Sequence, residues 1–367
     1  MKVLYFGTYE KDYPRNKIFI EGLKKNDVEV IEVNVSIKKN KEYKTNNFIA
    51  KNLVLGLKYL FSSIQLLIKG IKIKKFDLII VGFPSFFDIF PAKIISFFSG
   101  KKLVLNPLVS TYNTLIEDRK VIKKNSFTAK LIYQIEKTGL KLSDKIILDT
   151  KTHAEYFIEK FKLDKKKFLV IPVGAEEKIF YPRKDRKKDG FFVGFYGTFI
   201  PLHGIKYIIK AAKLLEKENI IFEIIGKGQI YLEIKSLAKE NSNIKFSKEV
   251  GLALLPEKIS KFDVCLGIFG ETKKASMVIP NKVFQCLAMK KPVITGESKA
   301  IKEVFIHKKN IFLCKMADEK SLTEAIIELK KNKALREKIS SEGNTLFNEK
   351  FTTKKIGIKL KKELEKI

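Results

Sequence analysis

The stretch FFVGFYGTFIPLHGIKYIIKAAKLL, residues 191–215, holds an apolar run, a glycine turn and a helical pattern in direct succession. FFVGFY is typical of a buried strand, and the apolar residues of IKYIIKAAKLL recur at helical spacing. A turn that leads into a helix can bind an anion, because the first helical N–H groups are unpaired and carry the positive end of the helix dipole. Alone, the turn favours an ordinary strand-to-helix connection.

The alternation of strand and helix continues along the whole chain. Strands are predicted at 2–6, 28–33, 77–81, 102–106, 145–148 and 168–172, and again at 191–196, 220–226, 243–246, 263–269, 292–295 and 311–314. Strands that alternate with helices form parallel sheets covered on both faces. The fold class is therefore α/β, with two doubly wound Rossmann-like domains.

The charged run FYPRKDRKKDG (180–190) separates the two sets of strands and is typical of a linker. We expect a first domain at 1–180, a hinge at 181–190 and a second domain at 191–349. The C-terminal helix, at about 350–367, is expected to pack back on the first domain, after a break near Gly343.

The formal net charge of +32 favours an anionic partner: nucleic acid, an anionic membrane surface or phosphorylated small molecules. Scattered lysine pairs can also reflect a compositional bias of the source. A nucleic-acid-binding protein would group basic residues with aromatics on one face, and the sequence shows no such module, so no nucleic-acid partner is expected.

Cysteine usage and the N-terminus favour a cytoplasmic location. Cys265, Cys286 and Cys314 are too widely spaced for a metal pattern, and reduced thiols are typical of the cytosol. Met1 leads directly into a predicted strand, with no signal peptide before it.

Two apolar segments raise the question of a membrane. Residues 78–98 contain Asp88, Lys93 and two prolines, which favours strand, loop and helix over a membrane span. Residues 48–75 are apolar and basic. We expect their apolar residues to pack as a helix, and contact with an anionic lipid surface at the inner face of the membrane is the alternative.

Three loops of the second half place glycine beside polar side chains directly after a strand. Since ligands of doubly wound sheets bind beyond the carboxyl ends of the strands, these loops predict one site. They contribute Gly197, Thr198, His203, Gly204, Gly226, Lys227, Gly228 and Gly270.

The segment IPNKVFQCLAMKKPVIT (279–295) predicts a helix that begins at Pro280 and Asn281. Lys282 stands in its first turn, where a cation opposes the helix dipole by about 0.3–1 kcal/mol unless an anion is near. Lys274 adds to this repulsion, which a bound diphosphate would relieve. A Lys282 side chain that extends into water is the alternative.

Four segments of the second half resemble the nucleotide-sugar domain of retaining glycosyltransferases of family 4. They are YGTFIPLHGIKYIIKAAKLL, IIFEIIGKGQ, FDVCLGIFG and IPNKVFQCLAMKKPVIT followed by Glu303, in family order and spacing. The first half resembles the family more loosely, through YFGTYEKDYPRNKIFIEGLKKNDVEVIEV (5–33). The resemblance implies the GT-B architecture, in which two Rossmann-like domains face each other across a cleft.

The activity that the resemblance implies is transfer of a hexose, with retention, from a nucleotide diphosphate sugar to a hydroxyl, in cell-surface polysaccharide or glycolipid synthesis. The leaving phosphate would help to accept the acceptor proton, so the protein chiefly stabilises charge on the diphosphate. Lys282, His203 and the amides around Gly197 would do this. A neutral His203 that only caps the helix start is the alternative. No metal or cofactor is expected.

The chain departs from the family at several donor-site positions. Many members have Arg in place of Thr198, Lys in place of His203 and a glutamate pair where Met277 and Gln285 stand. Gln285 can still hydrogen-bond a ribose hydroxyl. An epimerase-like or inactive protein of the same architecture remains the alternative. The expected donor-binding residues are Gly197, Thr198, His203, Gly204, Gly226, Lys227, Gly228, Lys274, Pro280, Asn281, Lys282 and Gln285.

The first domain is expected to bind the acceptor, which is a glycan or a lipid-linked molecule. Asp88 would orient the acceptor or serve as an ordinary helix cap, and Arg15 would suit an anionic acceptor. The acceptor-side residues are Gly7, Thr8, Arg15, Asp88 and Ser110.

Overall fold

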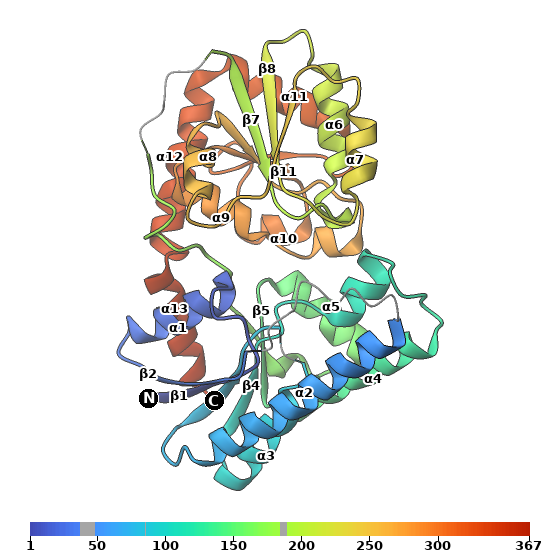
Figure 1. The fold of residues 1–367 in the computed structure, drawn as a ribbon. Coiled ribbons are helices and arrows are strands. Elements are labelled where there is room, and N and C mark those ends of the chain that lie inside the picture. The colour runs from blue at the N-terminus through green and yellow to red at the C-terminus, as the bar shows by residue number, and fades with distance from the viewer. Residues whose placement is uncertain (37–47, 85, 184–188) are drawn as a thin grey trace.

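The computed structural model describes residues 1–36, 48–84, 86–183 and 189–367, and for 48–57 it gives only the course of the backbone. It contains two six-stranded sheets, one in each half of the chain, and every strand pair in both is parallel. The two sheets lie in separate domains, one above the other in Figure 1. Residues 184–188 of the predicted hinge lie outside the described residues.

The first sheet has the order β2-β1-β3-β4-β5-β6. Its elements are β1 (Lys2–Gly7), α1 (Pro14–Lys24), β2 (Glu29–Asn34), α2 (Phe48–Ile71), β3 (Leu78–Val81), α3 (Ile89–Ser99), β4 (Lys102–Leu105), the π-helix η1 (Asn113–Asp118), α4 (Phe127–Leu142), β5 (Lys145–Leu148), α5 (Lys151–Phe161), the 3₁₀ helix η2 (Lys165–Lys167) and β6 (Phe168–Val170).

The second sheet has the order β12-β11-β10-β7-β8-β9. Its domain contains β7 (Phe191–Tyr196), the 3₁₀ helix η3 (Pro201–His203), α6 (Ile205–Leu214), β8 (Ile220–Ile225), α7 (Tyr231–Leu237), β9 (Ile244–Ser247), α8 (Leu255–Ser260), β10 (Val264–Leu266), the 3₁₀ helix η4 (Lys273–Ser276), α9 (Asn281–Ala288), β11 (Val293–Gly296), α10 (Lys299–Lys302), β12 (Phe312–Cys314), α11 (Glu319–Lys331) and α12 (Lys333–Lys350).

The predicted strands are all confirmed, with ends that shift by a few residues. The central strands are apolar on both faces because helices cover both. Tyr5 and Ile80 belong to a core shared with α1 and the C-terminal helix α13 (Thr353–Leu364), whereas Leu4 and Ile79 belong to a core shared with α2, α3, α4 and α5.

The break predicted near Gly343 is wrong, because this glycine lies inside α12. A Cβ at Gly343 would come within 2.6 Å of Leu287 Cδ2 and 2.9 Å of the Asn310 carbonyl oxygen, so glycine permits close packing on α9. The helical stretch is interrupted instead at Asn332 and between α12 and α13. Helix α13 lies against α1, where a Cβ at Gly22 would stand 2.7 Å from the Thr353 carbonyl oxygen.

Residues 78–98 form strand, loop and helix as predicted. The expectation that the apolar residues of 48–75 pack inside is wrong for most of the leucine, isoleucine and phenylalanine side chains that the structure describes in this segment. Leu66 is fully buried, but Leu60, Phe61, Ile64 and Ile68 are each about half exposed or more. Within the described residues, no helix is both long enough and apolar enough to cross a membrane.

Candidate donor site

Three loops of the second domain meet at the carboxyl edge of its sheet. The Gly197 amide donates to the Ile225 carbonyl oxygen at 3.0 Å, and the Phe199 amide donates to that of Lys227 at 3.0 Å. The third loop joins through the Phe269 amide, which donates to the His203 carbonyl oxygen at 3.1 Å. The glycine loops that the sequence predicts at one edge are therefore in contact.

Lys282 projects from the first turn of α9 toward the Gly197 loop. A Cβ built on Gly197 would lie 3.1 Å from Lys282 Nζ and 3.1 Å from His203 Cε1, so a side chain at this position would crowd both groups. Pro280 holds the N-cap position of α9, as predicted, and its side chain makes no capping bond.

The Lys282 ammonium is buried, and it forms no ion pair with another described residue. Its residue is 5% exposed, and Nζ has no hydrogen-bond partner in the described part of the chain. It lies 3.7 Å from the centroid of the Phe195 ring. Burial lowers the pKa of Lys282 well below its ordinary value. The alternative of a lysine that extends into water is therefore wrong.

His203 is neutral and turned toward its own loop. Burial, and next the charge of Lys282, lower its pKa well below the ordinary value. Its Nδ1 lies against the Thr198 carbonyl oxygen, so Nδ1 carries the proton. The helix-cap alternative is wrong, because Gly204 is the N-cap of α6 and no side chain caps that end.

The other predicted donor residues differ in their burial and contacts. The Gln285 side chain is buried, and its Oε1 accepts from the Tyr196 hydroxyl at 3.0 Å. The Met277 carbonyl oxygen accepts from Thr150 Oγ1 of the first domain at 2.5 Å. Asn281 opens α9, Gly226 and Gly228 pack against the loop after β7, and Thr198 and Lys227 are exposed.

Lys274 crosses to the first domain. Its Nζ donates to Thr114 Oγ1 at 2.6 Å, and the residue is 6% exposed. Burial lowers the pKa of Lys274 to about 8, an effect that the charge of Asp118 opposes. Lys274 therefore belongs to the seam between the domains rather than to the Gly197 loop.

The π-helix η1, which was not predicted from the sequence, supplies the first-domain side of this contact between the domains. Asp118 is 3% exposed, and neither of its carboxylate oxygens has a hydrogen-bond partner in the regions that the structure describes. The Arg119 carbonyl oxygen accepts from Gln229 Nε2 at 3.0 Å, and the Arg119 charge contributes to the lowered pKa of His203. The polar residues between β4 and α4 could have indicated a functional segment there.

A buried carboxyl group supports the start of η1. Glu136 accepts from the Thr111 amide at 3.2 Å and from the Tyr112 amide at 2.8 Å. Burial raises the pKa of Glu136 to about 7. Ser110 is also fully buried, and its Oγ accepts from the Asn113 amide at 3.0 Å, so it shapes this loop and does not face an acceptor.

Asp88 is buried and holds the loop that follows β1. Its Oδ2 accepts from both the amide and the hydroxyl of Thr8, the latter at 2.9 Å. Although Asp88 occupies the N-cap position of α3, its side chain makes no capping bond, so the cap interpretation is wrong. Asp88 fixes Thr8, which is partly exposed, beside the buried Gly7.

Arg15, expected beside an anionic acceptor, is a buried structural residue. Its side chain is fully enclosed, with Nε donating to Asn106 Oδ1 at 3.1 Å. Nη1 donates to the carbonyl oxygens of Ile171 and Pro172 at 2.7 and 3.0 Å. The guanidinium thus holds the chain that leaves β6.

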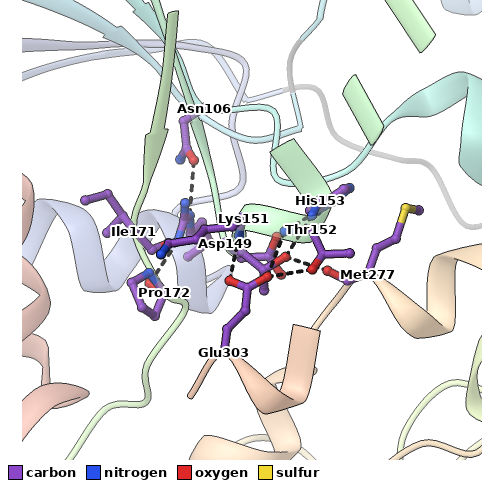
Figure 2. Close-up of polar contacts among 11 residues, drawn as sticks. Asn106, Asp149, Lys151, Thr152, His153, Ile171, Pro172, Met277 and Glu303 are labelled. Atoms are coloured by element: carbon purple, nitrogen blue, oxygen red, sulfur yellow. Dashed lines mark hydrogen bonds and ion pairs between the residues drawn. The ribbon is translucent and has the colours of Figure 1, made fainter. Parts of the chain in front are cut away.

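Glu303 joins the two domains at the start of α5. Its carboxylate accepts from the amides of Lys151 and Thr152, both at 2.7 Å, and from Thr152 Oγ1 at 2.6 Å (Figure 2). These N–H groups have no intrahelical partner, and the helix dipole favours a carboxylate there. The second domain therefore caps a helix of the first.

We expect Glu303→Ala to weaken this interdomain contact by about 1–3 kcal/mol, because three hydrogen bonds to a carboxylate are lost. Small-angle X-ray scattering should then show a larger radius of gyration than for the wild type. Glu297→Ala is the matched control, since Glu297 pairs with Lys302 inside the second domain. An unchanged radius for Glu303→Ala would show that the contact does not hold the domains together.

Two Rossmann-like domains that meet through the loops at their sheet edges define the GT-B fold, which confirms the predicted fold class. Residues 190–332 match the family model described as Glycosyl transferases group 1, so the second domain is similar to this family. No curated protein matches the sequence.

Solved structures share the whole fold at low sequence identity. Sucrose-phosphate synthase from Thermosynechococcus elongatus is 13% identical, with a TM-score of 0.72 over 100% of this chain and 98% of that one. Anabaena Alr3699/HepE in complex with UDP is 14% identical, with a TM-score of 0.69 over 100% of both chains. A glycosyltransferase from Rickettsia africae is 14% identical, with a TM-score of 0.63 over 99% and 97%.

Proposed function

We propose that the protein is a glycosyltransferase that binds the diphosphate of a nucleotide sugar between the Gly197 loop and α9. The observation that carries this proposal is the buried Lys282 ammonium, whose Nζ lacks a hydrogen-bond partner among the described residues and lies against Gly197. A buried cation is costly unless an anion compensates it. A diphosphate bound at the Gly197 loop would supply the missing partner.

Two cations, Lys282 and Arg119, support an anionic ligand at this site. His203 is neutral and Thr198 carries no charge, so neither supplies the fixed positive charge found in many family 4 enzymes. Lys282 carries this role in our proposal, with Arg119 of the first domain near His203 as a second cation. Both would stabilise the diphosphate as negative charge develops on it during sugar departure.

The finer assignment comes from the resemblance to family 4: retention of configuration, transfer of a hexose and a role in polysaccharide or glycolipid synthesis. Anabaena HepE has been solved with UDP-glucose, which makes UDP-hexoses the first donors to test. The described residues contain no cluster of His, Cys, Asp or Glu that could hold a metal. We propose metal-independent transfer, which requires activity to persist in EDTA.

On the acceptor side, we propose that Thr8, fixed by Asp88, and Asp118 contact the acceptor hydroxyl. The carboxylate of Asp118 is buried without a hydrogen-bond partner in the described regions, and a hydroxyl donor would satisfy it. A lipid-linked acceptor would place the enzyme at the cytoplasmic face of the membrane.

Thermal-shift measurements with UDP, GDP, ADP and UDP-glucose test the donor site. A nucleotide present at a hundred times its Kd should stabilise the second domain by about 2.7 kcal/mol, which raises the Tm of that domain by about 5–10 °C. If none of these nucleotides shifts the Tm, the donor-site proposal fails. A shift without release of nucleoside diphosphate from any sugar donor would favour an inactive binder, which the absence of glutamate at Met277 and Gln285 also motivates.

A further inference from the structure

Exposed apolar side chains are concentrated on one layer of the first domain. Of the twenty large apolar residues that the structure describes as exposed, thirteen lie on or beside α2, α3 and α4. Those helices cover the same face of the first sheet and lie at the end of the molecule away from the second domain (Figure 1). We call this surface the apolar face; it comprises Leu60, Phe61, Ile64, Ile68, Ile71, Phe87, Phe90, Ile94, Phe97, Phe98, Val121, Phe127 and Leu131.

The apolar face is built from helical stripes. Residues 60, 64, 68 and 71 recur at the spacing of one side of α2, and residues 90, 94, 97 and 98 do so on α3, with which α2 is in contact. Phe87 lies just before α3. Phe97 is 76% exposed and Phe98 is 80% exposed, and their rings touch edge to face. Soluble surfaces rarely carry a contiguous apolar area of this kind unless something binds it.

The charge around the apolar face identifies its partner. No Asp or Glu occurs in residues 48–76, 89–116 or 119–135, whereas lysines are frequent in all three. Exposed lysines at the ends of the helices include Lys69, Lys72, Lys74, Lys101, Lys102, Lys123, Lys124 and Lys130. Apolar side chains bordered by cations match a bilayer with anionic headgroups, since the rings enter the interface and the ammonium groups meet the phosphates.

A second copy of the chain is a poorer partner for this surface. A two-fold interface brings the same patch from each copy together, so lysines would meet lysines and no carboxylate from these segments would offset them. We therefore propose that the apolar face docks the protein on a membrane surface that contains anionic lipid. This inference goes beyond the proposed sugar transfer and does not depend on it.

Flotation with lipid vesicles tests the docking. The wild type should float with vesicles of phosphatidylcholine that contain about 30% phosphatidylglycerol, float much less with pure phosphatidylcholine, and detach as salt is raised. Phe97→Ser combined with Phe98→Ser should weaken partitioning by about tenfold or more, because two rings no longer enter the bilayer. Lys72→Gln combined with Lys74→Gln should reduce binding to the anionic vesicles and leave binding to pure phosphatidylcholine unchanged.

Leu232→Ser is the matched control, since Leu232 is 81% exposed on α7 of the other domain and should float like the wild type. Unchanged thermal melting will show that each variant is folded. The proposal is overturned if the wild type does not float at low salt, or if all variants float equally. It is also overturned if sedimentation shows a dimer that the double Phe→Ser variant dissociates, because a second copy would then cover the face.

Discussion

Lys282→Met is expected to lower kcat for sugar transfer by about 10²–10³-fold and, at the same time, to raise the Tm of the protein without ligand. The first effect follows because a cation placed against developing negative charge contributes strongly in a site closed to water. The second follows because the wild type buries an ammonium with no hydrogen-bond partner in the described structure, against the Phe195 ring. A methionine of similar length removes that desolvation cost, worth about 1–3 kcal/mol.

The same variant should change how nucleotide affinity depends on pH. Since burial holds the pKa of Lys282 well below its ordinary value, binding of an anion must draw a proton onto this amine at higher pH. Wild-type affinity should therefore fall as pH rises above the lowered pKa, and that part of the pH dependence should vanish in Lys282→Met. Titration calorimetry in two buffers of different ionisation enthalpy measures the proton uptake.

Lys290→Met is the matched control for this experiment, because Lys290 is exposed just beyond the other end of α9. It should leave kcat, Tm and proton uptake near the wild-type values. If Lys282→Met binds nucleotide as tightly as the wild type, then Lys282 is not a diphosphate contact. If Lys282→Met melts at a lower temperature than the wild type, the ammonium stabilises the fold without an anion, and the proposed desolvation cost is absent.

The alternation of strands and helices was enough to predict both sheets, because the central strands are buried on two faces and read as continuous apolar runs. Helix ends were harder to predict where tertiary packing overrides local propensity. Gly343 looked like a helix break but is a site of close approach between α12 and α9. Residues 48–75 looked like a packed helix, but nothing in a single sequence shows which side of α2 the sheet covers.

The positions of the expected donor residues were easier to predict than the surroundings of the expected acceptor residues. Gly197, Gly226 and Lys282 lie at positions set by strand ends and a helix start, which sequence patterns mark. Arg15 lies at the start of a helix and Ser110 follows a strand, yet the side chains of both form hydrogen bonds with nearby backbone groups. The seam around Asp118 and Arg119 depends on a π-helix and on contacts between domains, which have no periodic signal in the sequence.

Gly226→Ala is expected to destabilise the second domain by about 4 kcal/mol or more and to abolish nucleotide binding. Gly226 has φ +138°, a conformation that residues with a side chain rarely adopt. A Cβ there would also overlap the Gly197 carbonyl oxygen, which is backbone and cannot rotate away. The loops after β7 and β8 must separate to admit the methyl group. This separation breaks the contact between the two loops that lie beside Lys282.

Two other glycines separate strain from overlap. Gly100 has φ +67° with no atom within 4 Å of a built Cβ, so Gly100→Ala carries backbone strain alone and should cost about 1 kcal/mol. Gly251 has neither a neighbour within 4 Å nor a positive φ, so Gly251→Ala should be nearly neutral. Thermal melting of the three variants, with nucleotide titration of those that fold, should rank them in this order. Should Gly226→Ala melt like Gly100→Ala and still bind nucleotide, the loops after β7 and β8 would not need to be in contact for the donor site to form.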